Sequence, residues 1–485
     1  MKRLLILGAG ISGHTAALHA WNKLKGEHEV MVVSPNRNWN WIPSNIWVGV
    51  GFMNPSQVTF DLEEVYMKEG IHFRQAKALE IFPEGNDQHH KPCVLIEYTS
   101  DGRKGTQEFI EYDYLINATG PKLNFHATTG LGPDFNTYSV CTYGHAEHAW
   151  KALQLEINEM RHGKTKRIVI GTGHGTCTCQ GAAFEYLFNV EHILKEQGVR
   201  DKAELYWISN EAELGDFGMG GMHIKMGGYV THSKIFTESL YAERGIKWIT
   251  QASVKEVREK QLTYENLDGE FIDLDFDYAM LLPPFSGVGL KATAKDGADI
   301  TSQIFAANGF MKVDGDYTPK DYANWSPEDW PKTYINPTYD NMYAIGIAFA
   351  PPHSISKPMK SKNGTPIFPT PPRTGMPSGV MAREIAFNIC DRMLGKPEKA
   401  TRTASMAKMG AACIASAGAG ILNGTAVSMT VFPIVPDFET YKDTGRDMNY
   451  TNGEIGLAGH WIKYLLHYAF MYKAKAHPFW RLVPE

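Results

Sequence analysis

The chain has 485 residues, of which 43% are hydrophobic and 21% charged, and its formal net charge is −5. These values are typical of a folded protein of two or three domains; they exclude a largely disordered chain and give no case for nucleic-acid binding. The cysteines are too few and too scattered for a disulfide framework, and their spacing suits no zinc site. They are Cys93, Cys141, Cys177, Cys179, Cys390 and Cys413.

The N-terminal stretch predicts the unit around which the chain is organised. An apolar run, Leu4–Leu7, ends in Gly8-x-Gly10-x-x-Gly13, and a helix-forming stretch follows. Gly8 permits a tight turn, Gly10 lets the backbone approach a pyrophosphate, and Gly13 lets the helix pack close to the strand. The start of the helix offers free N–H groups to the phosphates. We therefore expect a dinucleotide-binding unit, and no signal peptide, because the first apolar residues already form the strand.

The second strand is expected over Glu29 to Val33. A dinucleotide site usually has Asp or Glu at its end, where the carboxylate binds the ribose. Here that position falls near Ser34, with Asn36 close by. This departure weakens the case for NAD at this site and leaves FAD, with Ser34 or Asn36 as the ribose partner.

Two later segments of the first unit indicate contacts with a flat ligand. Residues 38–51 form an aromatic loop around Pro43, Ser44 and Asn45, which we interpret as a lid on a cofactor rather than as plain core. A buried strand, residues 112–117, runs into a turn of small residues that contains Thr119 and Gly120. Such a turn lets backbone pass close to a planar ring.

A second unit of the same type begins at Arg167. A strand over residues 167–170 leads into Gly171-Thr172-Gly173-His174-Gly175, and the next strand covers residues 202–209. Two Rossmann-like units in one chain are the layout of two-dinucleotide flavoproteins. The second turn is irregular, because residues 176–179 carry two cysteines instead of the usual third glycine. Residues 278–282 are expected to return the chain to the first unit, whose last strand ends at Gly346.

The C-terminal stretch, residues 454–472, has the spacing of an amphipathic helix. Its apolar and aromatic positions recur every three or four residues: Leu457, Trp461, Tyr464, Leu465, Tyr468 and Met471. His460, Lys463 and His467 add basic character. Two interpretations stay open, a helix lying in a membrane interface and a helix docked on the protein's own core. No helix long and apolar enough to span a bilayer is expected.

Three cysteines are candidates for redox chemistry. Cys141 precedes His145 by four residues, so the two can share one face, and the imidazole can then exchange a proton with the thiol. Cys177 and Cys179 lie at a predicted helix start, where the helix dipole lowers the pKa of a thiol. The other three cysteines are expected to be inert packing residues.

Together these motifs resemble the sulfide:quinone oxidoreductase family, which is related to flavocytochrome c sulfide dehydrogenase. The likeness runs the length of the chain. It rests on the Gly8–Gly13 turn, residues 43–51, Asn117-Ala118-Thr119-Gly120, residues 141–146, residues 283–288, residues 343–348, Pro372-Arg373-Thr374-Gly375 and residues 459–463.

The resemblance implies FAD, oxidation of sulfide to polysulfide or sulfane sulfur at a cysteine site, and a membrane quinone (ubiquinone or menaquinone) as electron acceptor. Cys179 matches the family's central redox cysteine, Cys141 a cysteine that holds the flavin covalently in some members, and His145 a histidine near the sulfide side. Arg373 takes the place of a lysine beside the flavin pyrimidine. A peripheral protein of a bacterial-type inner membrane is implied, and a homo-oligomer is compatible with the resemblance.

One departure from the family pattern bears on the mechanism. The family's partner for the central cysteine lies just upstream of Pro372-Arg373-Thr374-Gly375, but residues 354–370 contain no cysteine. Either Cys177 or Cys141 pairs with Cys179, or sulfide is not the substrate. The alternatives are a quinone reductase fed by NADH or another sulfur donor, and a catalytically silent flavin-binding subunit. The irregular second glycine turn and the missing acid near Ser34 argue against NADH.

The expected fold is α/β, with two Rossmann-like dinucleotide-binding domains of the glutathione-reductase type and a C-terminal membrane-associating helical region. Residues 1–160 and 276–395 are expected to form the FAD-binding domain. Residues 161–275 form the second Rossmann-like domain, and residues 396–485 the quinone and membrane interface.

Overall fold

The computed structural model describes residues 1–418, 422 and 424–485. Its first sheet is built from β1 (Arg3–Leu7), β2 (Glu29–Ser34), β5 (His72–Phe82), β6 (Cys93–Tyr98), β7 (Gln107–Glu111), β8 (Tyr114–Asn117), β20 (Lys291–Ala292) and β21 (Met342–Ala344). The order is β21-β8-β1-β2-β5-β6-β7, with β20 pairing to β5. The strands from β21 to β5 are parallel, whereas β6 and β7 join antiparallel. The apolar run that predicted β1 is buried at the centre of this sheet.

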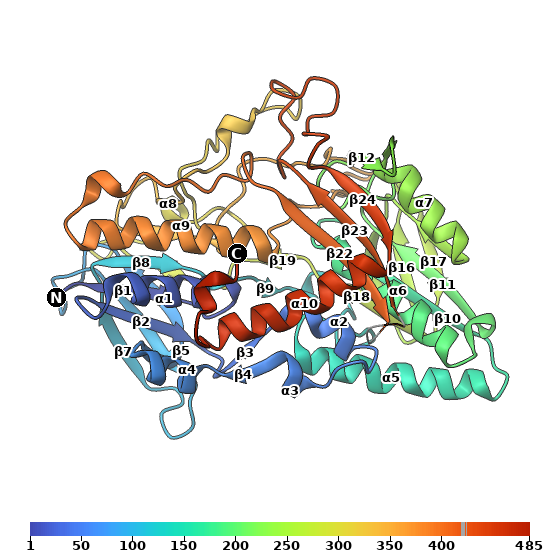
Figure 1. Cartoon of the computed structure of the whole chain (residues 1–485), viewed down its shortest axis with the longest axis horizontal. Helices are drawn as coiled ribbons and strands as arrows, with labels where there is room; N and C mark the ends of the chain where they lie inside the picture. Colours follow the sequence, from blue (N-terminus) through green and yellow to red (C-terminus); the bar gives the residue numbers. More distant parts are fainter. Residues whose placement is uncertain (419–421, 423) are drawn as a thin grey trace.

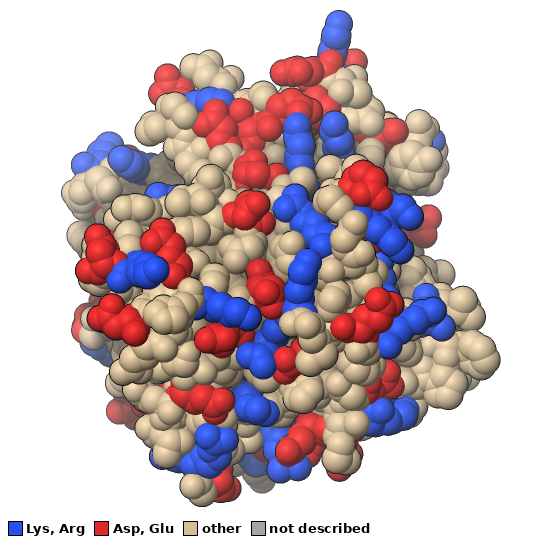
Figure 2. Space-filling model, turned by 90° about the vertical axis from the view of Figure 1, so that its left-hand side faces the viewer, with Lys and Arg blue, Asp and Glu red and all other residues tan. Residues whose placement is uncertain are grey.

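Helices cover this first sheet. They are α1 (Ile11–Leu24), α4 (Leu62–Glu69) and α9 (Gly375–Met393), and α1 and α9 lie side by side (Figure 1). The predicted first dinucleotide-binding unit is therefore present, and its last strand, β21, returns from far along the chain as expected. Figure 2 shows basic and acidic side chains interleaved over one face of the molecule, without a field of one sign, in keeping with the small net charge.

The second sheet is wholly parallel. It consists of β10 (Lys166–Thr172), β11 (Ala203–Ile208), β14 (Ile246–Ile249) and β18 (Tyr278–Leu282), in the order β14-β11-β10-β18. Its helices are α5 (Tyr143–Arg161), α6 (Gln180–Glu196) and α7 (Ser233–Glu243). The expected domain boundary at 275/276 is corrected here, because β18 pairs with β10 instead of returning to the first sheet. β18 is apolar and buried throughout, so its sequence does not say which parallel sheet it joins.

A region of β structure precedes the C-terminal helix. It contains β22 (Ala411–Gly418), β23 (Gly424–Val431) and β24 (Asn452–Gly456), which continue through β12 (His223–Met226) and β13 (Tyr229–His232) into one five-stranded sheet. The strand β22 packs along α6, as Figure 1 shows for the orange strands beside the green helix. The sequence predicted a helical C-terminal region. The structure shows that this region also contains a sheet, whose strand β22 packs against α6.

The predicted C-terminal helix is α10 (Leu457–Ala474), and it crosses from the sheet back to the first unit (Figure 1). The carbonyl oxygen of Ala474 lies 2.7 Å from His14 Nε2, and the terminal Glu485 lies 2.5 Å from His19 Nε2. The end of the chain is thus anchored on α1. In the described part of the chain, no helix combines the length and apolar character that crossing a bilayer requires.

Shorter elements complete the fold. They are β3 (Asn38–Asn40), β4 (Thr59–Asp61), η1 (Ile42–Ser44), α2 (Asn45–Val48), α3 (Pro55–Val58), β9 (Lys122–Leu123), η2 (Phe125–Ala127), η3 (Arg200–Lys202), β15 (Ser253–Arg258), β16 (Gln261–Glu265), β17 (Phe271–Asp275), β19 (Phe285–Ser286), α8 (Thr301–Ile304), η4 (Pro327–Asp329), η5 (Gly346–Ala348), η6 (Pro397–Lys399) and η7 (Trp480–Leu482).

Candidate redox site

The glycine turn after β1 has the geometry of a phosphate cradle. Gly8 has φ +96°, and a Cβ there would lie 2.2 Å from the carbonyl oxygen of Ala118. A Cβ on Gly13 would lie 2.0 Å from the carbonyl oxygen of Gly8, so neither position accepts a side chain. Gly10 is the N-cap of α1, and a Cβ there would meet no heavy atom within 4 Å beyond its own chain neighbours. The first N–H groups of α1 therefore remain available for a pyrophosphate.

The predicted partners of the cofactor gather around this turn. The parallel register aligns Leu7 of β1 with Val33 of β2 and Asn117 of β8, so Ser34 and Thr119 follow at the same sheet edge. Gly346, with φ +64°, comes from the strand next to β8, and a Cβ there would lie 2.0 Å from the hydroxyl oxygen of Ser12 in α1. The structure brings these residues together at the carboxyl ends of the strands, where open α/β sheets bind ligands.

Arg373 places a buried positive charge in this region. It is 5% exposed, and its Nη1 donates to the carbonyl oxygens of Ile347 at 2.7 Å and Phe349 at 2.6 Å. No carboxylate of the described residues forms an ion pair with it. Burial lowers the pKa of Arg373 to about 10, and the nearby thiol of Cys179 opposes that shift. A buried cation without an acidic partner can stabilise an anionic ring, such as a reduced flavin. An apolar group in that place would leave the charge of Arg373 uncompensated.

Cys179 is the N-cap of α6, with φ +66°. Burial raises the pKa of its thiol, while the hydroxyl of Thr178 and the charge of Arg373 act in the opposite direction. The expectation of a lowered thiol pKa is thus wrong in its net sign, because burial raises the pKa of the Cys179 thiol.

Cys177 and Cys141 both lie close enough to Cys179 to interact electrostatically with it. The thiol of Cys177 donates to the carbonyl oxygen of Leu282 at 3.0 Å, and burial raises its pKa well above the ordinary value. Burial raises the pKa of Cys141 to about 11. All six cysteines are free thiols.

A fourth cysteine reaches this cluster from the C-terminal sheet. Cys413 lies on β22, and a Cβ on Gly181 of α6 would come within 3.2 Å of its sulfur. Burial raises the pKa of Cys413 to about 11, and the neighbouring Cys179 adds to the shift. Cys413 thus lies beside the cluster, and its expected role as a packing residue stays a prediction. Cys93 and Cys390 are buried.

The expected pairing of Cys141 with His145 is not formed. Cys141 precedes the N-cap of α5, Thr142, so the two residues do not share a helix face. The backbone N–H of Cys141 donates to Ser139, and the ring of His145 packs edge-on against Phe125 at 5.9 Å. Burial lowers the pKa of His145, which keeps its imidazole neutral.

The tryptophans of the aromatic loop are core, and the lid interpretation is wrong for them. Trp39, Trp41 and Trp47 are buried, and Trp41 stacks on Phe470 of α10 with ring centroids 4.9 Å apart. Several apolar rings in one short loop have the same composition whether they cover a cofactor or anchor a helix.

Neighbouring polar residues of that loop also have protein partners. Ser44 Oγ lies 2.9 Å from His467 Nδ1, and Asn45 and Asn40 exchange two amide hydrogen bonds. A cofactor role for Pro43, Ser44 and Asn45 stays a prediction.

The second glycine turn is covered by protein. A Cβ on Gly175 would lie 2.1 Å from the carbonyl oxygen of Pro366, and the N–H of Phe368 donates to the carbonyl oxygen of Gly175 at 2.8 Å. The N–H of Thr370 donates to the carbonyl oxygen of Cys177 at 3.1 Å. Residues 366–370 thus lie on the turn where a second dinucleotide would approach.

The acid that follows β11 is also engaged. Glu211 accepts hydrogen bonds from Ser209 at 2.8 Å and from the N–H of Phe217 at 2.9 Å. Burial raises its pKa to about 8, so it is not a free carboxylate for a ribose.

A buried ion pair beside the cysteines was missed from the sequence. Lys463 of α10 lies 3.0 Å from Glu185 of α6, whose other oxygen accepts the N–H of Ser416 in β22. Lys463 also donates to the carbonyl oxygen of Ile414 at 3.4 Å. The sequence features that could have indicated this pair are an acidic residue, Glu185, in an apolar helix and a lysine, Lys463, in an aromatic-rich helix. Around Cys413 the residues are small and mostly apolar, and the sequence gives no strong helix or strand signal there.

A first sheet with a parallel core and a glycine cradle, a second, parallel sheet, and a cysteine close to a buried arginine are typical of a two-dinucleotide-fold flavoprotein oxidoreductase. No family model matches the chain. It is 29% identical over 417 residues to the sulfide-quinone reductase of Aquifex aeolicus, covering 86% of this chain and 81% of that protein. It is 22% identical over 350 residues to the mitochondrial sulfide:quinone oxidoreductase of Dictyostelium discoideum, a match that covers 71% of this chain and 65% of that protein's length.

Solved structures agree with these relatives. The sulfide:quinone oxidoreductase of Aquifex aeolicus superimposes with a TM-score of 0.75 at 26% identity, over 98% of this chain and 92% of that one. NDH2 from Plasmodium falciparum in complex with NADH shares the fold, with a TM-score of 0.63 at 14% identity over 98% of this chain and 96% of that one. The chain is thus similar to sulfide:quinone oxidoreductases over most of its length, in sequence and in fold.

Proposed function

We propose that this protein oxidises sulfide to polysulfide or sulfane sulfur and passes the electrons through a cysteine site and FAD to a membrane quinone. The observation that carries the proposal is Cys179, a half-buried thiol at the N-terminus of α6 beside the cation of Arg373 and among three further thiols. A disulfide in such a cluster is the natural target of hydrosulfide, since thiolate-type nucleophiles attack disulfide sulfur.

The residues present fit FAD. The N-terminus of α1 would take the pyrophosphate, Ser34 the adenosine ribose, and the turn at Thr119 and Gly120 one edge of the flavin. When bound, the flavin supplies an acceptor for two electrons at a time. Arg373 would hold its charge against the ring and stabilise the added negative charge. Cys179 would form and break sulfur–sulfur bonds on the side of the flavin where sulfide reacts.

The alternative of NADH as donor is disfavoured by the covered second turn. Residues 366–370 and the engaged Glu211 leave neither the phosphate turn nor the ribose acid of the second unit free. The silent-subunit alternative is disfavoured by the clustering of redox-capable thiols around Cys179. The family fold itself accommodates NADH in other members of the structural class, so the donor is decided by direct titration.

The test is an anaerobic titration of the purified flavoprotein with sulfide, followed by a soluble quinone. We expect sulfide to bleach the flavin absorbance and quinone to restore it, while NADH at the same concentration leaves the flavin oxidised. A flavin that stays oxidised in sulfide overturns the proposal, and bleaching by NADH would move the assignment to the alternative donor.

The helix α10 supports membrane binding on one of its faces. Its inner face docks on the protein through His460, His467, Met471 and Ala474, which are buried. Its outer face exposes Trp461, Ile462, Leu465, Tyr468 and Tyr472, with Leu465 67% exposed. The two interpretations of this helix combine, because it docks through one face and presents a second, largely apolar and aromatic face outward. We propose that this outer face lies in the interface of a bacterial-type inner membrane, where the quinone is taken up.

We predict that Leu465→Asp with Tyr468→Asp weakens binding to anionic lipid vesicles at least about tenfold, since each exposed apolar side chain contributes about 1.5–3 kcal/mol on burial. The measurement is vesicle co-sedimentation. The matched control is Met67→Asp, at a 78% exposed apolar position on α4. Point changes are preferred to removal of residues 454–485, because the end of the chain is anchored on α1. Unchanged sedimentation of the double variant, or an equal loss in the control, would contradict the assignment.

A further inference from the structure

The family's second redox cysteine is absent from its usual place, and the structure shows what lies there. Backbone atoms of Thr370 bond to Cys177 and Thr178 of the loop that leads into α6. The segment thus keeps its position next to the central cysteine without bringing a sulfur. If a disulfide is to form at Cys179, its partner comes from another element.

Three thiols are near enough to Cys179 to interact with it electrostatically: Cys141, Cys177 and Cys413. Cys177 also interacts with Cys141. Cys413 comes from β22 and lies next to Glu185 and Lys463. Cys179 is thus the thiol with which all three others interact.

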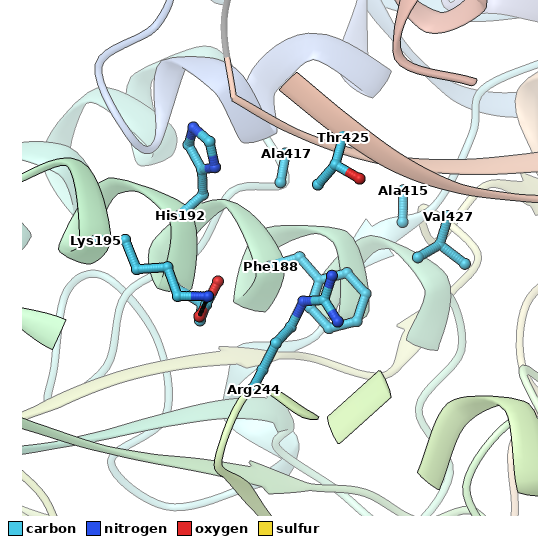
Figure 3. A pocket seen from close by; sticks show the side chains of 9 residues that line it. Phe188, His192, Lys195, Arg244, Ala415, Ala417, Thr425 and Val427 are labelled. Atoms are coloured by element: carbon cyan, nitrogen blue, oxygen red, sulfur yellow. Dashed lines mark ion pairs between the residues drawn. The ribbon is translucent and has the colours of Figure 1, made fainter. Parts of the chain in front are cut away.

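The packing of β22 on α6 directs Cys413 at the helix start. Side chains alternate along a strand, so Cys413, Ala415 and Ala417 share a face. Figure 3 shows Ala415 and Ala417 lining a cavity of about 80 Å³ with Phe188 and His192 of α6. The same face carries Cys413 to the first turn of α6.

At that turn the helix has no side chain in the way. Gly181 is the second residue of α6, and a Cβ there would come within 3.2 Å of the sulfur of Cys413. Any larger residue would push the sulfur off the first turn, whose N-cap is Cys179. The amide of Asn189 donates to the carbonyl oxygen of Ser416 at 2.6 Å and fixes β22 in this register.

Cys177 and Cys141 are less suited to the role. The thiol of Cys177 is fully buried and donates to Leu282, away from the C-terminal sheet. A bond between Cys177 and Cys179 would also close a ring of only three residues at the left-handed N-cap. Cys141 matches, by the family resemblance, a cysteine that holds the flavin covalently in some members.

We propose that Cys413 is the second redox cysteine of this chain and forms the working disulfide with Cys179, in place of the cysteine that other members carry upstream of the Pro-x-Thr-Gly motif. This inference rests on the proposed function, because the disulfide is the target of sulfide. It assigns a catalytic role to the C-terminal sheet.

The chemistry balances as follows. Hydrosulfide attacks the sulfur of Cys413; a sulfur–sulfur bond forms between them, the bond to Cys179 breaks, and Cys179 leaves as a thiolate beside Arg373. A second hydrosulfide attacks the persulfide on Cys413 and releases HSSH, leaving Cys413 as a thiolate. The two thiolates re-form their bond and give up two electrons, which the bound flavin accepts. Two hydrosulfide ions thus yield one HSSH and two electrons.

Arg373 stabilises the thiolate of Cys179. At Cys413 the carboxylate of Glu185 acts against the thiolate, and Lys463 offsets that effect. In thiol–disulfide exchange the thiol whose anion is more stable leaves faster, so we expect Cys179 to be the leaving group.

The test is a disulfide map of the full-length flavoprotein, which does not depend on turnover. The protein is oxidised anaerobically with diamide, unfolded in an alkylating agent and digested without reduction for mass spectrometry. We expect two of the six thiols to be lost and a cross-linked peptide to join Cys179 to Cys413. A cross-link from Cys179 to Cys177 or Cys141, or six alkylated thiols, overturns the proposal.

Variants add a second readout. Cys413→Ser should show no cross-link and a rate of sulfide-dependent flavin reduction at least about a hundredfold lower, with the flavin spectrum unchanged. The matched control is Cys93→Ser, another buried strand cysteine, which should keep the cross-link. If the Cys179–Cys413 peptide is found but sulfide fails to reduce the flavin, the disulfide assignment is supported and sulfide is ruled out as the substrate. If sulfide reduces the flavin of Cys413→Ser at the wild-type rate, the disulfide assignment is wrong and sulfide remains the substrate.

Discussion

Cys179→Ser is expected to abolish sulfide-dependent reduction of the flavin while the flavin stays bound. The thiol lies at the centre of the cluster, so every sulfur exchange that ends in electron transfer passes through it. A hydroxyl neither forms a disulfide nor leaves as a stabilised anion, and loss of such a nucleophile costs about a thousandfold or more in rate. The measurement is stopped-flow absorbance of the flavin after anaerobic mixing with sulfide.

Flavin content is the internal control of this experiment. The cradle of Gly8, Gly13 and the start of α1 lies on the first sheet and does not depend on the sulfur of Cys179. The matched variant is Cys390→Ser, a buried cysteine of α9 whose sulfur lies 3.7 Å from the carbonyl oxygen of Ala20. We expect this control to reduce at the wild-type rate. Sustained turnover in Cys179→Ser would remove Cys179 from the mechanism.

The first unit of the fold could be predicted because its signals are local. The glycine turn, the apolar strand before it and the helix after it occupy neighbouring positions, and the backbone requirements at Gly8 and Gly13 leave no other residue type. The ends of β2 and β8 follow from the rule that parallel strands point their carboxyl ends to one edge. Arg373 was placed by the family resemblance, and its burial without an acidic partner gives that placement a physical reason.

The sequence-based predictions were wrong where the structure depends on contacts between elements that are distant in sequence. β18 is apolar on both faces, a pattern that fits either parallel sheet, and only its pairing with β10 moves it into the second unit. An aromatic residue such as Trp41 gives the same sequence pattern whether it covers a cofactor or packs against a helix. Its stacking on Phe470 shows that it packs against α10.

Thiol acidity and the place of Cys413 needed the three-dimensional structure for a different reason. The start of α6 can be predicted from the sequence, but the desolvation that raises the thiol pKa depends on what covers the helix start. What covers it is β22, which comes from a stretch of small residues that has no strong helix or strand signal. The contact between Gly181 and Cys413 joins positions far apart in the chain, so no spacing rule could show it.

Lys463→Met is expected to destabilise the protein by about 3–5 kcal/mol, the cost of leaving one member of a buried ion pair without its partner. The side chains of Lys463 and Glu185 are 12% and 7% exposed, and their charged atoms lie 3.0 Å apart. The pair joins α10 to α6 and borders Cys413, so its loss also loosens the sheet beside the cysteines. The measurement is the urea midpoint of unfolding, followed by fluorescence.

The loss should depend on pH with a definite sign. Burial already raises the pKa of Glu185, and Lys463 acts against that shift, so its removal raises the pKa of Glu185 further. Between the unfolded pKa and the raised folded pKa, the native state binds more protons than the unfolded state, and stability falls as the pH rises. The deficit of Lys463→Met relative to the wild type should therefore be larger at pH 8 than at pH 5.

Two further variants separate a buried charge from lost packing. Glu185→Gln combined with Lys463→Met removes both charges, and we expect it to recover more than half of the deficit at pH 8, because no unpaired ion remains. Lys151→Met breaks an exposed pair with Glu147, in which the lysine side chain is 66% exposed, and should change the midpoint little. Equal deficits of Lys463→Met at pH 5 and pH 8, or a double variant no more stable than the single one, would show that Glu185 carries no uncompensated charge and that α10 is held by packing alone.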